Sequence, residues 1–300
     1  MAALDETKII DRVAEEEIFA RMLQFQTARR VMIVSDGRGR GKTDLLRKLR
    51  YVCSYLQEVP VALVDLEVHR VGEEFDIAQT IRNQLAQGGV EFKGFDDLDQ
   101  ARSLGDKTHF MGRLQSVEGT VDLSGATVSG QAIIAGQMFK IEHTDNVSLP
   151  PWTDESERYA RALCVEALFH DLHAYSQEKA LVLLFDAVDR ADETMRRWVL
   201  LDVLRRRFLG EAANRRIVLV LAGVGLDAML GGLKPEQRDC LEPVATLSEW
   251  DFEHVARFLD VHGYPNLSDS DIQLIHGVIA SGKPLTTALM FAQVLKSEAS

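Results

Sequence analysis

Residues 36 to 44 combine three glycines with a lysine and a threonine at a spacing that suits phosphate binding. The segment is Asp36-Gly37-Arg38-Gly39-Arg40-Gly41-Lys42-Thr43-Asp44. The Walker A pattern has Gly, four residues, Gly-Lys and then Ser or Thr, because main-chain N–H groups must surround the phosphates without obstruction by side chains. Three glycines, Gly37, Gly39 and Gly41, supply this open backbone. The segment therefore predicts a loop that binds a nucleoside triphosphate.

The polar side chains of this loop have separate expected roles. Lys42 would reach the β- and γ-phosphates, Thr43 would ligate Mg²⁺, and the N-terminus of the following helix would add partial positive charge. The predicted nucleotide-binding residues are Gly37, Arg38, Gly39, Arg40, Gly41, Lys42, Thr43 and Asp44. One position departs from the pattern: Asp36 stands where the first glycine is expected, and its carboxylate would weaken the affinity for a polyanion.

Two carboxylates follow the most apolar run of the chain. Asp186 ends the run Ala180-Leu181-Val182-Leu183-Leu184-Phe185, and Asp189 comes three residues later. At the carboxyl end of a strand next to the loop, Asp186 would hold Mg²⁺, while Asp189 would orient or deprotonate the attacking water. The alternative is that both only cap the turn and the next helix. Because no glutamate follows Asp186, we expect slow hydrolysis.

The flanking residues predict an α/β fold with a mostly parallel sheet flanked by helices. Short apolar runs predict buried strands, and apolar residues at three- and four-residue spacing predict helices. The expected strands are residues 31–35, 61–66, 180–186 and 216–222, and the expected helices are residues 43–57, 75–87, 154–176 and 191–209.

Two domains are predicted. Residues 1–246 would form the nucleotide-binding α/β domain, with a β-rich hairpin insertion at about 88–151, where Gly, Ser and Thr are frequent. Residues 247–300 would form a small helical lid domain. Two helix starts are expected there, because Ser248 with Asp251 and Ser268 with Asp271 have the spacing of a capping box.

Composition narrows the classes of partner. The formal net charge of −12 repels polyanions and so disfavours nucleic acid as a partner.

No apolar stretch is long enough for a membrane helix, and residues 1–11 lack a secretory signal pattern, so we expect a cytoplasmic protein. Three cysteines without a CxxC pair predict reduced thiols. His170 and His173 have no third ligand nearby in the sequence, so no metal site is predicted there.

A run of arginines is the exception to this acidic balance. It predicts a solvated helix face, or an arginine finger offered to a neighbouring subunit. The arginines are Arg196, Arg197, Arg205, Arg206, Arg207, Arg215 and Arg216.

Taken together, these motifs resemble the STAND class of P-loop NTPases, relatives of AAA+ ATPases that include NACHT and NB-ARC domains. The strand ending in Asp186, with Asp189 three residues on, is similar to that class's hhhhDxxD motif, and Gly282-Lys283-Pro284 is similar to the GxP motif of its lid. The resemblance implies ATP as the nucleotide, with Ile10-Asp11-Arg12 and Glu16 near the adenine. It also implies a lid that closes over the nucleotide, and switching through a protein partner or a homo-oligomer.

Three other functions remain open at this point. A DNA-acting AAA+ ATPase would use the arginine cluster, and its activity would respond to DNA and salt. A small-molecule kinase would transfer the phosphate to an acceptor other than water. A non-hydrolysing scaffold would bind nucleotide without turnover, and Asp36 is the residue that keeps this reading open.

Lys42→Ala tests the loop assignment. We expect the change to abolish nucleotide binding, because alanine cannot offset the charge of the phosphates. Titration with ATP, ADP and GTP measures the effect, and unchanged binding would reject the assignment.

Overall fold

The computed structural model describes most of the chain outside residues 111–151. The described residues are 12–37, 40–68, 73–105, 110, 152–211, 216–242, 247, 250–281 and 285–298. The chain divides into two compact units, of which the first comprises Met1–Gly72 with Glu178–Ser300 and the second comprises Glu73–Gln177. The second unit is thus inserted into the sequence of the first.

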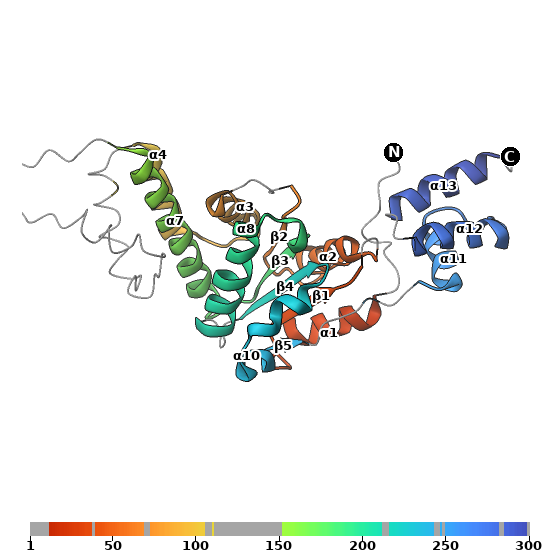
Figure 1. The fold of residues 1–300 in the computed structure, drawn as a ribbon, viewed down its shortest axis with the longest axis horizontal. Coiled ribbons are helices and arrows are strands. Elements are labelled where there is room, and N and C mark those ends of the chain that lie inside the picture. The colour runs from red at the N-terminus through yellow and green to blue at the C-terminus, as the bar shows by residue number, and fades with distance from the viewer. Residues whose placement is uncertain are drawn as a thin grey trace, which may run out of the picture. The chain divides into compact units, whose positions relative to one another are not determined.

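A parallel sheet of five strands forms the centre of the first unit (Figure 1). Its order is β2-β3-β4-β1-β5, and every neighbouring pair is parallel. The strands are β1 (Val31–Ser35), β2 (Val61–Asp65), β3 (Leu181–Asp186), β4 (Ile217–Gly223) and β5 (Leu241–Glu242). Every residue of β1, β3 and β4 is buried, as continuous apolar runs in a parallel sheet require. The predicted fold class is confirmed.

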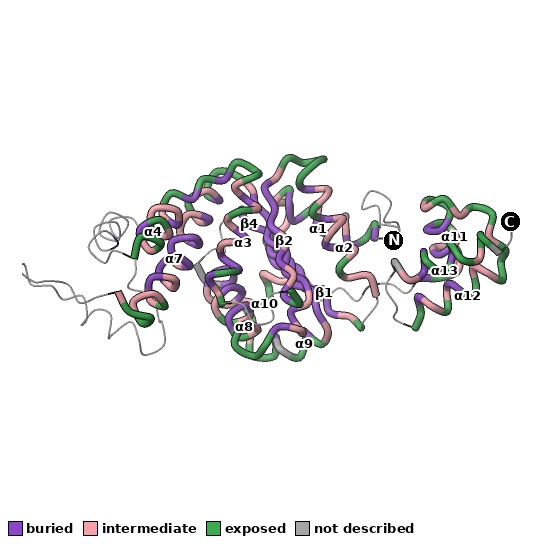
Figure 2. The backbone as a smooth tube through the Cα atoms, turned by 90° about the horizontal axis from the view of Figure 1, so that it is seen from above, coloured by how far each residue is buried: buried purple, intermediate pink, exposed green. Residues whose placement is uncertain are grey.

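Helices cover both faces of this sheet. In Figure 2 the buried strands run between α1 and α2 on one side and α8 on the other. The helical segments here are α1 (Val13–Leu23), α2 (Lys42–Tyr51) with its π-helical continuation η2 (Val52–Leu56), η4 (Val188–Arg190), α8 (Glu193–Arg197), the π-helical η5 (Trp198–Glu211), α9 (Leu226–Met229), η6 (Leu230–Gly232) and α10 (Pro235–Asp239). The apolar stripe of α2, Leu45, Leu46 and Leu49, packs on Val182 and Leu184 of β3.

Residues 250–298 form three helices with a core of their own. They are α11 (Phe252–Val261), α12 (Asp269–Ala280) and α13 (Leu285–Glu298), and their core includes Trp250, Phe258 and Ile275. The predicted capping box of Ser268 and Asp271 is present at the start of α12. At α11 the prediction needs correction, because Asp251 is itself the N-cap and accepts from the His254 N–H at 2.9 Å.

The second unit is helical in its described part. It contains α3 (Glu74–Gln87), α4 (Lys93–Ser103) and α7 (Asp154–Tyr175). The prediction of a β-rich insertion from residue 88 is therefore wrong for α4, where Phe95, Leu98 and Ala101 recur at helical spacing and are buried. Residues 111–151, which carry the predicted hairpin, lie outside the described residues.

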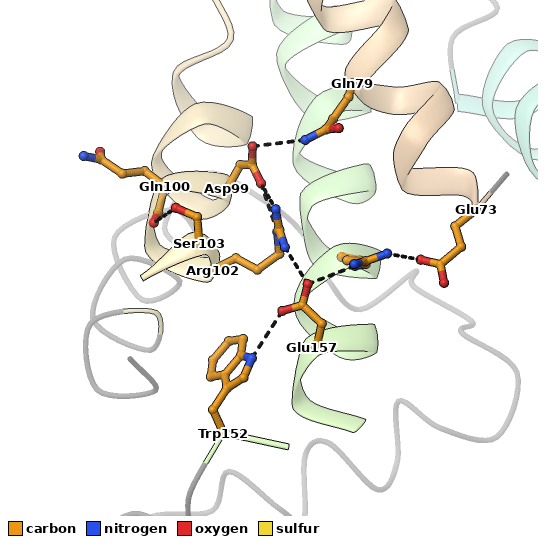
Figure 3. A network of polar contacts seen from close by, with 9 residues as sticks. Glu73, Gln79, Asp99, Gln100, Arg102, Ser103, Trp152 and Glu157 are labelled. Atoms are coloured by element: carbon orange, nitrogen blue, oxygen red, sulfur yellow. Dashed lines mark hydrogen bonds and ion pairs between the residues drawn. The ribbon is translucent and has the colours of Figure 1, made fainter. Parts of the chain in front are cut away.

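Ion pairs join the helices of this second unit (Figure 3). Arg102 on α4 donates to Glu157 on α7 at 2.5 Å and to Asp99 at 2.7 Å. Glu157 also accepts from Arg161 at 2.9 Å and from the Trp152 indole at 3.2 Å. Since one carboxylate serves three donors on different segments, the network fixes the register of α4 against α7.

The start of α4 lies very close to α7. Asp171 on α7 accepts from the Phe95 N–H at 2.9 Å, so this carboxylate satisfies a free N–H at the helix N-terminus. Burial raises the pKa of Asp171, and the hydrogen bond from Phe95 acts in the opposite direction. A methyl group added at Gly94 would lie 3.0 Å from one Asp171 oxygen and 3.2 Å from the other.

Gly94→Ala tests this close approach. We expect the free energy of unfolding to fall by about 1–3 kcal/mol, because the added methyl group forces the helices apart. Gly277→Ala in α12 is the matched control: nothing lies within 4 Å of its added methyl group, so it should stabilise its helix by about 1 kcal/mol. Urea unfolding followed by helical circular dichroism measures both, and a stabilising Gly94→Ala would contradict the prediction.

Candidate functional site

The glycine-rich loop joins β1 to α2, as the sequence predicts. Gly41 is the N-cap of α2 and has φ +80°, a left-handed conformation that glycine adopts without strain. Lys42 and Thr43 are the first two residues of α2, which places them at the positive end of the helix dipole. Arg38 and Gly39 lie outside the described residues.

The Lys42 side chain folds back over its own loop. Its Nζ donates to the carbonyl oxygens of Asp36 at 2.7 Å and Gly37 at 2.5 Å. Burial lowers the pKa of Lys42, while the charges of Asp36, Asp189 and Asp186 act to raise it. The ammonium group is therefore held against the main chain at the start of the loop, where the charges of these three carboxylates act on it.

Arg12 donates a hydrogen bond to the main chain of the loop. Its side chain is buried, with 3% exposed, and its Nη2 donates to the Arg40 carbonyl at 2.9 Å. A methyl group added at Gly41 would lie 3.4 Å from the same nitrogen. The sequence pointed to Arg12 only as part of the segment near the adenine, whereas its hydrogen bond shows that it braces the glycine-rich loop at Arg40.

Asp36 uses its carboxylate within the protein. One oxygen accepts from the Gly37 N–H at 2.6 Å, and the other accepts from the Leu247 N–H at 3.0 Å. Leu247 is buried in the core that α2 covers. The residue that replaces the first glycine of the pattern thus ties the loop to the segment that precedes α11.

Asp186 lies at the end of β3 and meets Thr43. Only 4% of it is exposed, and it accepts hydrogen bonds from the Thr43 hydroxyl and from the Ala187 N–H, the latter at 2.8 Å. Burial raises its pKa, and these hydrogen bonds counter that effect. We expected Asp186 on the strand next to β1, but β4 lies between them. Because α2 packs across β4 and β3, Thr43 still reaches Asp186.

Asp65 is a carboxylate that the sequence analysis missed. It ends β2 and pairs with Asp186 in the parallel ladder of β2 and β3. Its Oδ1 accepts from the Glu67 N–H at 2.9 Å, and its charge raises the pKa of Asp186. The available signal was an aspartate ending a second apolar run, at the same edge of a parallel sheet as Asp186.

Asp189 contacts the end of β4. Its Oδ1 accepts from the Val224 N–H at 2.9 Å, and its Oδ2 lies 3.6 Å from the Arg190 Nε. A methyl group at Gly223 would lie 3.0 Å from that Oδ1. This crowding explains why β4 ends in glycine, since any side chain there would meet Asp189. Asp189 fixes the loop after β3 against β4.

The remaining sequence candidates have structural partners. Asp44 forms an ion pair with Arg47 at 3.7 Å. No group of three or more His, Cys, Asp or Glu that could hold a metal ion occurs among the described residues. Cys53, Cys164 and Cys240 are free thiols, and burial raises the pKa of the first two to about 12.

The oxygen atoms of this site fit Mg²⁺. A threonine hydroxyl bonded to a buried carboxylate is the kind of hard oxygen donor pair that Mg²⁺ prefers, with water and phosphate oxygens completing its coordination. Strand order, loop and carboxylate together define a P-loop NTPase fold.

Among known proteins, only solved structures are similar to this chain. No protein-family model matches the chain, and no curated protein does. The chain is similar to Cdc6p from Pyrobaculum aerophilum, with 15% identity over 98% of the chain and a TM-score of 0.47. It is also similar to the Aeropyrum pernix ORC2 protein in ADPNP–ADP complexes, with 14% identity over 96% of the chain and a TM-score of 0.47. A third similar structure is the Aeropyrum pernix ORC1 protein in complex with DNA, with 14% identity over 92% of the chain and a TM-score of 0.45. The chain spans 64%, 62% and 57% of these three structures, respectively.

One expectation about partners is corrected. The net charge disfavoured nucleic acid, but one of the similar structures is a complex with DNA. The exclusion is therefore withdrawn, since a whole-chain charge does not describe a local surface. Among the described residues, no helix is long and apolar enough to cross a membrane.

Asp36→Gly separates the two effects of this carboxylate. We expect the affinity for ATP to rise by up to about fivefold, because a negative charge beside the phosphates is removed. The free energy of unfolding should fall by about 1–3 kcal/mol, because the Leu247 N–H loses its acceptor. ATP titration and urea unfolding measure the two quantities, with Asp36→Asn as the control that keeps one side-chain oxygen. Unchanged stability of Asp36→Gly would show that the bond to Leu247 contributes nothing.

Proposed function

We propose that this protein binds ATP with Mg²⁺ and hydrolyses it slowly. The observation that carries the proposal is the hydrogen bond from Thr43 to Asp186, which joins the helix that starts at the phosphate-binding loop to the end of β3. Thr43 follows Lys42 at the start of α2, and the charge of Asp186 acts on the Lys42 ammonium group. The groups that would hold the phosphates and those that would hold the metal therefore belong to one site.

Each residue has a role that follows from its position. Lys42 would leave the carbonyls of Asp36 and Gly37 and bind the β- and γ-phosphates, while the main-chain N–H groups at the start of α2 bind phosphate oxygens. Thr43 and Asp186 would hold Mg²⁺, which neutralises charge that develops on the phosphates during transfer. Arg12 keeps the loop in shape through Arg40.

The STAND resemblance suggests the use of this reaction as a switch. ATP and ADP would favour different arrangements of the helical residues 250–298, and the bond between Asp36 and Leu247 connects the loop to the segment before them. The resemblance to the GxP motif rests on Gly282-Lys283-Pro284, which lie outside the described residues. The predicted boundary at residue 247, the protein partner and the homo-oligomer remain proposals.

A second candidate is an ATPase that acts on DNA. Five arginines, Arg196, Arg197, Arg205, Arg206 and the buried Arg207, lie on the helical segment formed by α8 and η5. The DNA in one similar structure names a ligand to try. Stimulation of hydrolysis by duplex DNA, with a steep loss of the effect as salt is raised, would favour this candidate. A rate of hydrolysis that does not change when DNA is added would exclude this candidate and leave the nucleotide-dependent switch as the proposed function.

Asp186→Asn tests the proposed reaction. We expect phosphate release from ATP to fall by about 10²-fold or more, because the metal loses its charged partner, and EDTA should have the same effect on the unaltered protein. Binding of ADP measured without Mg²⁺ should persist, since Asn still accepts from the Ala187 N–H.

Asp192→Asn is the matched control for this variant. Asp192 caps α8 by accepting from the Met195 N–H at 2.8 Å, and asparagine caps helices equally well. Phosphate release that survives both Asp186→Asn and EDTA would contradict the proposed function. Binding of ATP without any release would support the non-hydrolysing scaffold instead.

A further inference from the structure

The proposed reaction lacks an obvious carboxylate to act on the attacking water. No glutamate follows Asp186; residue 187 is alanine, in a left-handed conformation with φ 55°. The sequence candidate Asp189 uses one oxygen for the Val224 N–H and places the other 3.6 Å from Arg190. Its contacts bind the loop after β3 to β4, so another acid has to be considered.

The sheet register places Asp65 beside Asp186. These two residues are partners in the parallel ladder of β2 and β3, and neighbouring strands lie about 4.8 Å apart. Side chains of partner residues project from the same face of a sheet. Both carboxylates therefore stand at one edge of the sheet, on one face of it.

That face is the one covered by α2. Side chains alternate along a strand, and the core under α2 contains Val61 of β2 together with Val182 and Leu184 of β3, while Leu63 packs against it. Asp65 follows Leu63 by two residues, and Asp186 follows Leu184 by two, so both continue the same rows. The contact of Asp186 with Thr43 confirms that these rows end at the N-terminus of α2.

We propose that Asp65 is the carboxylate that orients the water attacking the γ-phosphate and accepts its proton. The water oxygen forms a bond to the γ-phosphorus while the bond from that phosphorus to the β,γ-bridging oxygen breaks, and the electron pair leaves with the diphosphate. The proton of the water passes to Asp65 and then to solvent. The inference rests on the proposed hydrolysis of ATP.

A purely structural role for Asp65 makes a different prediction. Its Oδ1 accepts from the Glu67 N–H at 2.9 Å. This contact, in which an aspartate side chain accepts from the N–H two residues later, forms a turn that is common in proteins and needs no catalytic role. Asparagine keeps this acceptor but cannot take up a proton. Asp65→Asn therefore preserves the turn and removes only the proposed chemistry.

The test compares Asp65→Asn with Glu67→Gln, which alters the next carboxylate along the chain, an exposed one. We expect Asp65→Asn to lower kcat for phosphate release by about 10²- to 10⁴-fold, with the Kd for ATP and the urea midpoint unchanged. Glu67→Gln should leave kcat as it is. If Asp65→Asn fails to fold, Asp65→Ser is the second variant, because a hydroxyl can also accept the Glu67 N–H.

Three results would overturn the proposal. Turnover by Asp65→Asn within threefold of the unaltered protein would remove Asp65 from the reaction while leaving the ATPase function intact. Loss of turnover in Asp189→Asn together with normal turnover in Asp65→Asn would return the role to Asp189. Absence of any ATP hydrolysis by the unaltered protein, across metal and salt conditions, would overturn the proposed hydrolysis and this inference together.

Discussion

The hydrogen bond between Thr43 and Asp186 is the contact on which the site depends. It requires α2 to start directly at the glycine-rich loop after β1 and to pack across β4 onto β3, because β4 lies between β1 and the strand that ends in Asp186. The apolar stripe of α2 provides that packing. A buried carboxylate without a partner would be costly, so the threonine hydroxyl also stabilises the fold.

Much of this arrangement could be predicted from the sequence. The runs that became β1, β3 and β4 are apolar at every position, and α2 has apolar residues at helical spacing, so their types followed from periodicity. Lys42, Thr43 and Asp186 were singled out in the sequence because their spacing follows a known pattern next to such a run. The strand order could not be predicted, because the position of β4 between β1 and β3 depends on pairing between distant segments and not on the local sequence of any strand.

Most of the missed features are long-range contacts. Asp65 and Asp186 become neighbours because β2 pairs with β3. In the sequence these two strands are separated by the whole second unit. Arg12 reaches the Arg40 carbonyl, and Asp36 reaches the Leu247 N–H, across long stretches of sequence. Helix α4 was missed for a different reason: the Gly- and Ser-rich residues that follow it dominated the composition of the predicted insertion.

The insertion of the second unit between β2 and β3 has a consequence for folding. Closing a loop costs conformational entropy that grows slowly with its length, and a segment that compacts first shortens the effective loop. During synthesis, β1 and α2 emerge early, whereas β3 emerges only after α3, α4 and α7. The glycine-rich loop and its helix are thus made long before the carboxylate of Asp186 exists, so nascent chains cannot bring Thr43 and Asp186 together until the inserted helices have left the ribosome.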